Sequence, residues 1–198
     1  MGTITQNVDN LHQAAGHPHS HLLELHGSVH HVKCMTGCGW ETTRDAWQSM
    51  LEAENGFFLP ALADADAVSR TASSEAPDGD YDREMDEDVL AAFTVPSCPS
   101  CSGIVTPSFI FMGGFLQPHV KQRAADLVDA ASSIVALGTS LQIGSAFQLV
   151  TRAHRQGKPL LVVNVGPTRA DGLAEECVAA RTGELMPLVA EMVLAEGR

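Results

Sequence analysis

Four cysteines in two close pairs constrain the fold of this 198-residue chain more than any other feature of its sequence. Cys34 and Cys38 form the first pair, and Cys98 and Cys101 form the second. Thiolates bind Zn²⁺ in a tetrahedron, and two short cysteine turns supply four ligands. We therefore predict one structural zinc ion per chain, held in a small zinc-ribbon lobe. Buried or redox-active cysteines are the alternative interpretation.

The fifth cysteine and the N-terminal residues bear on the compartment. Cys177 stands alone, and we expect it to be a small buried hydrophobic residue. The N-terminus lacks a basic region followed by an apolar stretch, so no secretory signal is expected. The chain has no run of 18 apolar residues, so no membrane association is expected. Paired cysteines in this context indicate a reducing, intracellular compartment, either cytoplasmic or nuclear.

The net charge of −12 is concentrated in one segment. Residues 52–88 carry 12 of the 24 acidic side chains and two basic ones, and the rest of the chain is close to neutral. Residues 54–94 are rich in small, polar and acidic residues, a composition that predicts a disordered acidic insertion. Without a basic stripe to displace phosphate counterions, direct binding to nucleic acid is not expected.

Helices and apolar strands alternate after the second cysteine pair. Helical spacing covers residues 118–131, 145–156 and about 183–194, and apolar strands cover 133–137 and 160–165. This alternation predicts an α/β fold with a Rossmann-like parallel sheet. The predicted domains are 1–30 with 106–198 for the Rossmann-like part, and 31–105 for the zinc lobe and its insertion. A further buried strand is predicted at 109–112.

Two polar features follow the predicted strands. Gly138-Thr139-Ser140 comes directly after one strand, and Asn164 lies at the end of the next. Ligands of open α/β sheets bind at the carboxyl ends of the strands. A glycine lets the backbone approach a phosphate, hydroxyl groups bond to it, and an amide can hold a ribose hydroxyl. An ordinary strand-to-loop turn is the alternative.

Seven of the nine histidines lie between His12 and His31. Most of them are expected to belong to a polar loop rather than to a metal site. His26 differs because it lies between the apolar run Leu22–Leu25 and Gly27. A histidine at the end of a rigid strand is a candidate general base, or it is simply structural.

Taken together, these motifs resemble the sirtuin family, the NAD-dependent protein deacylases. The segment from Thr5 to His12 resembles the family's Gln-Asn-x-Asp-x-Leu-His motif. Glu24-Leu25-His26-Gly27-Ser28 resembles the segment that holds the family's catalytic histidine. The cysteine pairs, the Gly138 turn and the strand ending at Asn164 occur in the family's order. The resemblance covers nearly the whole chain outside residues 54–94.

The resemblance implies a protein-lysine deacetylase or deacylase that transfers the acyl group of an acylated protein or peptide to ADP-ribose. NAD is consumed and nicotinamide is released. His26 would be the base acting on the ribose hydroxyls. The implied NAD-binding residues comprise a nicotinamide and ribose group, a phosphate group and one adenosine ribose contact: Gln6, Asn7 and Asp9; Gly138, Thr139 and Ser140; and Asn164.

Three departures from the family pattern qualify this expectation. The family's N-terminal Gly-rich turn, which cradles the pyrophosphate, is lacking, so we expect an N-terminally incomplete sheet and weak NAD binding. Met112-Gly113-Gly114 stands where the family usually has Phe-Gly-Glu, and Ser145-Ala146 stands where it has Pro-Ala. Two other interpretations are a truncated zinc-binding remnant without catalysis and a protein ADP-ribosyltransferase.

Overall fold

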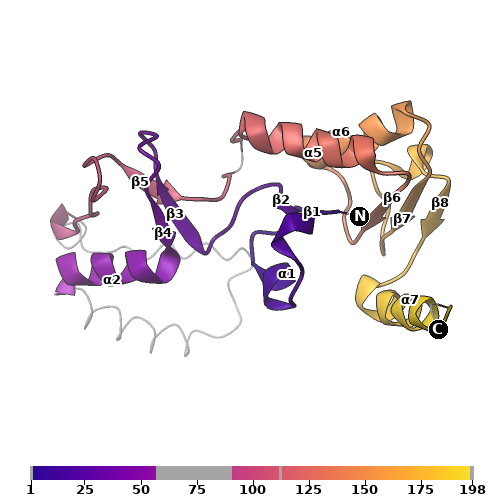
Figure 1. The fold of residues 1–198 in the computed structure, drawn as a ribbon, viewed down its shortest axis with the longest axis horizontal. Coiled ribbons are helices and arrows are strands. Elements are labelled where there is room, and N and C mark those ends of the chain that lie inside the picture. The colour runs from indigo at the N-terminus through magenta and orange to yellow at the C-terminus, as the bar shows by residue number, and fades with distance from the viewer. Residues whose placement is uncertain (1, 57–90, 112, 197–198) are drawn as a thin grey trace. The chain divides into compact units, whose positions relative to one another are not determined.

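The computed structural model describes residues 2–56, 91–111 and 113–196, and the chain divides into two compact units (Figure 1). One unit comprises Met1–Gly27 with Ile110–Arg198, and the other comprises Ser28–Phe109. The chain thus crosses between units after residues 27 and 109, close to the crossings proposed from the sequence after residues 30 and 105. Most of the predicted acidic insertion lies outside the described residues.

Parallel strands form the framework of the first unit. β1 (Thr3–Thr5) pairs with β2 (Leu22–Glu24), and Ile4 lies opposite Leu23. A second parallel sheet has the order β6-β7-β8, formed by β6 (Ile134–Leu137), β7 (Leu160–Val163) and β8 (Glu176–Val178). The central strand β7 is apolar throughout and largely buried, as expected for a strand with neighbours on both sides.

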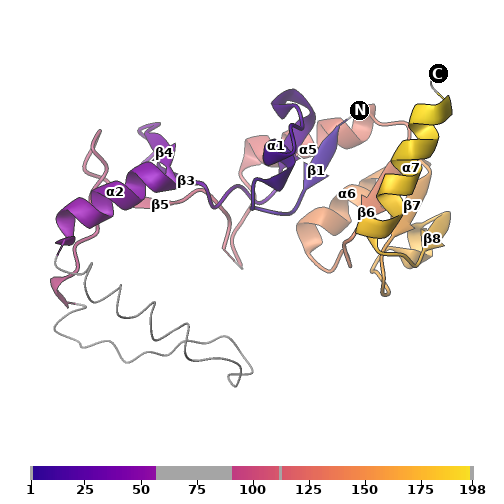
Figure 2. The same ribbon diagram turned by 90° about the horizontal axis from the view of Figure 1, so that it is seen from below.

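Helices separate these strands along the chain, as in a Rossmann-like α/β fold. The helical elements of this unit are α1 (Leu11–Ala14), η1 (His19–His21), α5 (Pro118–Ala130), α6 (Gly144–Arg155), η3 (Asp171–Leu173) and α7 (Thr182–Glu196). α5 and α6 lie side by side in both views (Figures 1 and 2). Their buried faces join β2, β6 and β7 in one hydrophobic core that includes Leu25, Ala124, Ala146, Val150 and Leu160.

The first unit leaves sheet edges and apolar surface exposed. Among the described residues, β1 pairs with β2 alone and β6 pairs with β7 alone. Val135 and Leu137 of β6 are 53% and 42% exposed. The last helix, α7, also exposes Leu188 and Met192. Backbone groups at such edges can accept a further strand.

The described residues of the second unit include a small antiparallel sheet and the helix α2 that follows it. Its strands have the order β4-β3-β5, formed by β4 (Glu41–Thr43), β3 (His31–Cys34) and β5 (Val105–Pro107). Helix α2 (Arg44–Glu54) begins after Thr43, whose hydroxyl accepts a hydrogen bond from the N–H of Ala46 at 3.2 Å. This N-cap satisfies a backbone donor in the first turn. Trp47 is the buried side chain of this helix.

One strand prediction is wrong. The apolar run 109–112 was expected to be a buried strand, but the strand of this region is β5, which ends at Pro107. Residues 109–111 belong to no strand, and Phe111 is 58% exposed. Met112 lies outside the described residues. The run is apolar in sequence, but its described residues pair with no neighbouring strand. No helix in the described parts of the chain has the length and apolar character needed to span a membrane.

Candidate functional site

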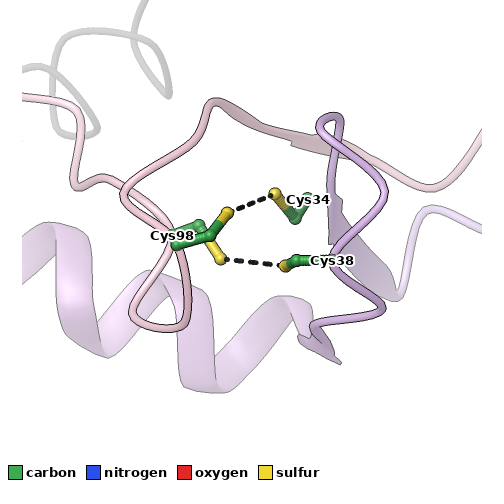
Figure 3. Close-up of side chains that lie close together, drawn as sticks. Cys34, Cys38 and Cys98 are labelled. Carbon is green, nitrogen blue, oxygen red and sulfur yellow. Dashed lines mark hydrogen bonds between the residues drawn. The ribbon is translucent and has the colours of Figure 1, made fainter.

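The four paired cysteines converge in the second unit. Cys34 ends β3 and Cys38 follows in the turn toward β4, while Cys98 and Cys101 lie in the loop before β5. Their sulfur atoms all lie within 4.8 Å of one another. The turn between Cys34 and Cys38 contains Gly37 at φ 77°, a left-handed conformation that glycine adopts without strain. Figure 3 shows three of these side chains pointing toward one another.

The sulfur spacing fits a zinc ion. A tetrahedron with Zn–S bonds of about 2.3 Å has sulfur atoms about 3.8 Å apart. The sulfurs of Cys34 and Cys101 are 3.5 Å apart, and those of Cys38 and Cys98 are 3.7 Å apart. These distances are far too long for a disulfide bond and match the edges of a tetrathiolate site. A site closed by four protein ligands is structural rather than catalytic.

A threonine hydroxyl lies against two of these sulfurs. Thr36 Oγ1 is 2.9 Å from Cys34 Sγ and 3.0 Å from Cys101 Sγ. The hydrogen bond from Thr36 lowers the pKa of the Cys34 thiol to about 6 and also lowers the pKa of Cys101. Both effects favour the thiolate, which is the metal-binding form. The cysteine pattern did not point to Thr36, because its side chain becomes relevant only when the second pair folds beside it.

In the first unit, His26 is held by two polar contacts. It follows β2 closely, and its Nδ1 is 3.1 Å from the backbone carbonyl oxygen of Gln6. Its Nε2 is 2.9 Å from the hydroxyl oxygen of Ser145, in the first turn of α6. The imidazole is partly buried. The strand order thus brings a titratable ring, the segment after β1 and the start of α6 to the carboxyl ends of the strands.

Gln6 also reaches the predicted phosphate turn. Its side-chain amide donates a hydrogen bond to Thr139 Oγ1 at 2.9 Å. The same oxygen accepts from the N–H of Leu141 at 3.2 Å. Gly138 has φ 60°, so the turn after β6 favours a residue without a Cβ atom. Gln6, His26 and Thr139, all selected from the sequence, are therefore linked by hydrogen bonds: His26 through the backbone of Gln6, and Thr139 through its side chain.

A pocket of about 380 Å³ opens beside this turn. Gly138 and Asn164 line it, together with Val165 and the segment Ala180–Glu184 that leads into α7. The side-chain amide of Asn164 donates to the carbonyl of Gly166 at 2.8 Å, which holds it at the end of β7. The pocket lies at the carboxyl ends of three parallel strands, where ligands of open α/β sheets bind.

The remaining predicted residues lie in more exposed positions. Asn7 is exposed, and its backbone N–H bonds to Thr5. Asp9 is exposed and accepts a hydrogen bond from the N–H of Leu11 through its carboxylate. Ser140 is exposed, and its carbonyl accepts from the N–H of Arg169. The expectation for the fifth cysteine is wrong: Cys177 is exposed on β8, an outer strand, rather than buried.

The fold and the site define a Rossmann-like α/β protein with a tetracysteine lobe, and comparisons with known proteins agree. The Sir2 family model matches residues 1–145. This chain belongs to the Sir2 family, the sirtuins.

Individual relatives are named as NAD-dependent enzymes that act on proteins. An NAD-dependent protein deacylase from Monosiga brevicollis is 44% identical over 186 residues, covering 93% of this chain and 57% of the relative. An NAD-dependent protein deacetylase from Bordetella bronchiseptica is 39% identical over 170 residues, covering 86% and 57%. The bovine mitochondrial NAD-dependent protein lipoamidase sirtuin-4 is 36% identical over 186 residues, covering 94% and 54%. This chain thus spans little more than half the length of these relatives.

Solved structures show the same fold. A Sir2 complex with an inhibitor, 2′-O-acetyl-ADP-ribose and a deacetylated p53 peptide matches with a TM-score of 0.65 and 26% identity. The match covers all of this chain and 64% of the solved one. An NAD complex of a Sir2 homologue matches with a TM-score of 0.68 and 22% identity, covering 99% and 59%.

Proposed function

We propose that this chain belongs to an NAD-dependent protein-lysine deacylase, with His26 as its general base. The observation that carries the proposal is the connected group of His26, Gln6 and Thr139 at the carboxyl ends of the strands. Family membership and the names of the relatives support the same activity.

The contacts of the imidazole define its role. A backbone carbonyl can only accept a hydrogen bond, so His26 Nδ1 carries the proton and Nε2 of the neutral ring is the basic atom. Nε2 already faces a hydroxyl group, that of Ser145. A ring oriented in this way can take a proton from a substrate hydroxyl, which is the step that a ribose hydroxyl requires.

The chain's other residues would bind and orient NAD. The pocket lined by Gly138, Asn164 and the start of α7 is a suitable place for the adenosine part. The turn at Gly138–Ser140 would approach the phosphates, and Gln6, Asn7 and Asp9 would face the nicotinamide end. Bound NAD would supply an electrophilic ribose carbon with nicotinamide as its leaving group, and the acyl oxygen of the substrate would be the nucleophile. An amide oxygen is a weak nucleophile, so the protein must contribute positioning.

The four cysteines would hold one zinc ion that stabilises the second unit. Their sulfur spacing supports this assignment, and the metal would take no part in the chemistry because its four ligand positions are filled. Thiolate ligands persist in a reducing environment, so we also propose an intracellular location.

The test uses the full product of the gene. We expect it to convert an acylated peptide, NAD and water into the peptide with an unmodified lysine side chain, nicotinamide and acyl-ADP-ribose, as measured by mass spectrometry. His26→Ala should abolish this activity while leaving NAD binding, measured by calorimetry, within about two-fold. A matched control is His154→Ala, an exposed histidine in the last turn of α6. Activity retained in His26→Ala would refute the assigned base.

Mass spectrometry separates the proposal from the second candidate function. A protein ADP-ribosyltransferase would leave ADP-ribose attached to the protein substrate, with the acyl group still on lysine. The relatives are named a deacylase, a deacetylase and a lipoamidase, so acetyl, longer acyl and lipoyl peptides should be compared.

A further inference from the structure

Ser145 makes a contact that the resemblance to the family did not predict. It is the second residue of α6, and its hydroxyl oxygen lies 2.9 Å from His26 Nε2. The two residues are 119 positions apart in the chain. The sequence marked Ser145 only as a departure, because the family usually has proline at this position. A proline there has no hydroxyl to offer to the ring.

The direction of this hydrogen bond follows from the other side of the ring. The carbonyl oxygen of Gln6 accepts from Nδ1, so in the neutral imidazole Nε2 holds a lone pair and no proton. The Ser145 hydroxyl must then be the donor to Nε2. The ring is thus held at both nitrogens, by the backbone that follows β1 and by a side chain in the first turn of α6.

Two hydrogen bonds restrain a histidine more than one does. A single bond at Nδ1 lets the ring tilt about that contact, whereas a second bond at Nε2 fixes its plane. Ser145 is partly buried and lies on a twelve-residue helix packed into the core through its neighbour Ala146. The donor is therefore carried by a rigid element, which is the arrangement that holds a reactive group in position.

We propose that Ser145 is a positioning residue for His26. Its hydroxyl holds the ring with Nε2 unprotonated and facing the start of α6, at the place from which a substrate hydroxyl gives up its proton. When that substrate hydroxyl arrives, the serine side chain rotates to another staggered rotamer and yields the lone pair of Nε2. The catalytic part of this inference rests on the proposed deacylase function, but the contact itself does not.

Nitrogen NMR of the histidine rings in the full gene product tests the contact directly. In the wild type, His26 should be the tautomer protonated at Nδ1, with Nε2 accepting a hydrogen bond; His26→Ala assigns its signals. Ser145→Ala should move the Nε2 resonance downfield, toward that of an unbonded nitrogen, and leave Nδ1 in place. Ser145→Thr keeps a hydroxyl and should restore the wild-type spectrum.

A further substitution at the same position shows whether the effect of Ser145→Ala comes from misfolding. Ser145→Pro removes the hydroxyl at a position in the first helical turn, where proline is well tolerated. It should give the same loss of the Nε2 bond as alanine. The exposed Ser132, in the loop before β6, provides the control Ser132→Ala, which should leave the His26 signals unchanged.

Kinetic measurements separate the hydrogen bond itself from its proposed role in catalysis. Ser145→Ala should lower kcat for deacylation roughly ten-fold, comparable with the loss of one hydrogen bond, with little change in the KM for NAD. An Nε2-protonated tautomer in the wild type would overturn the contact, as would an Nε2 resonance that stays unmoved in both Ser145→Ala and Ser145→Pro. An unchanged kcat despite a moved resonance would overturn the positioning role. A wild type with the expected spectrum but no deacylase activity would instead refute the proposed function.

Discussion

The side-chain amide of Gln6 donates a hydrogen bond to the hydroxyl oxygen of Thr139 at 2.9 Å, across 133 residues of sequence. Gln6 follows β1 and Thr139 follows β6, so the bond joins the carboxyl ends of two strands that belong to different sheets of the first unit. This relationship connects the predicted nicotinamide segment with the predicted phosphate turn.

Thr139→Val should destabilise the protein. It removes the acceptor for both Gln6 and the N–H of Leu141 while keeping a β-branched side chain of similar size. Two lost hydrogen bonds predict a decrease of about 1–2 kcal/mol in the free energy of unfolding, measured by urea denaturation. Thr106→Val, in β5 of the other unit, is the matched control and should change stability by less than about 0.5 kcal/mol. Equal stability of the Thr139 variant and the wild type would show that the bridge contributes nothing.

Metal analysis should give one zinc per chain. Cys98→Ala should abolish stoichiometric zinc and destabilise the protein on the order of 4 kcal/mol, because the free energy of metal binding is also free energy of folding. Cys177→Ala, which removes an exposed thiol outside the cluster, should keep both zinc and stability. A wild-type protein that is stable and free of metal would contradict the zinc assignment.

Thr36→Val should shift the pH dependence of zinc binding. The Thr36 hydroxyl is the largest of the causes that lower the pKa of the Cys34 thiol to about 6, so the thiolate persists to a lower pH than in an ordinary cysteine. Without the hydroxyl the thiol pKa rises, and protons compete with zinc up to a higher pH. The midpoint of zinc release on acidification should therefore move to higher pH, as followed with a chromogenic chelator. Thr42→Val on β4 is the control, and identical midpoints would argue against the contact.

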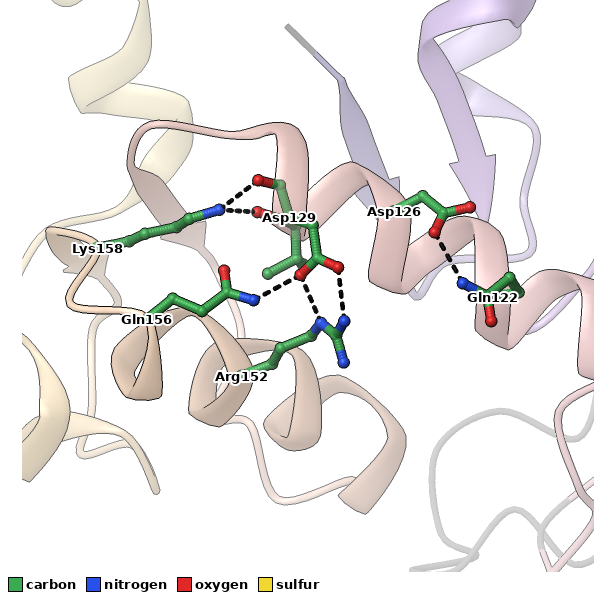
Figure 4. A network of polar contacts seen from close by, with 7 residues as sticks. Gln122, Asp126, Asp129, Arg152, Gln156 and Lys158 are labelled. Carbon is green, nitrogen blue, oxygen red and sulfur yellow. Dashed lines mark hydrogen bonds and ion pairs between the residues drawn. The ribbon is translucent and has the colours of Figure 1, made fainter.

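Asp129 should contribute stability that disappears in acid. Its carboxylate, at the end of α5, accepts hydrogen bonds from Arg152 and Gln156, while Lys158 donates to the carbonyl oxygens of Val128 and Asp129 (Figure 4). These bonds, first of all those from Arg152, hold the pKa of Asp129 well below its usual range.

A carboxyl group with a depressed pKa stabilises the folded state above its unfolded pKa of about 3.9, and that stability is lost as the pH falls toward the folded pKa. Asp129→Asn should thus lower stability at pH 7, and the difference should shrink below about pH 4. Thermal unfolding at several pH values measures this. Asp126→Asn is the comparison, because the Asp126 carboxylate accepts one hydrogen bond, from Gln122, and acts on Arg152 only through its charge. It should show a smaller effect.

Much of the second half of the fold could be predicted from local sequence. The helices at 118–131 and 145–156 and the strands at 133–137 and 160–165 lie within about two residues of the observed elements. The strand predicted at 109–112 failed because an apolar run indicates burial only when a neighbouring strand is available to pair with it. The exposure of Cys177 was missed for a similar reason, since β8 pairs on one side only among the described residues.

The sequence alone determined those features whose chemistry is local. These features are the spacing within each cysteine pair, the glycine after an apolar strand and the residues beside His26. Within each of them the residues are only a few positions apart, so the local sequence largely sets their geometry. The tertiary structure decided which distant groups meet: Thr36 with Cys101, Gln6 with Thr139, and His26 with Ser145. These contacts depend on the order in which strands and helices pack. Strand order is set by the whole core rather than by any short stretch of residues, and the identity of Ser145 alone therefore carried no sign of its partner.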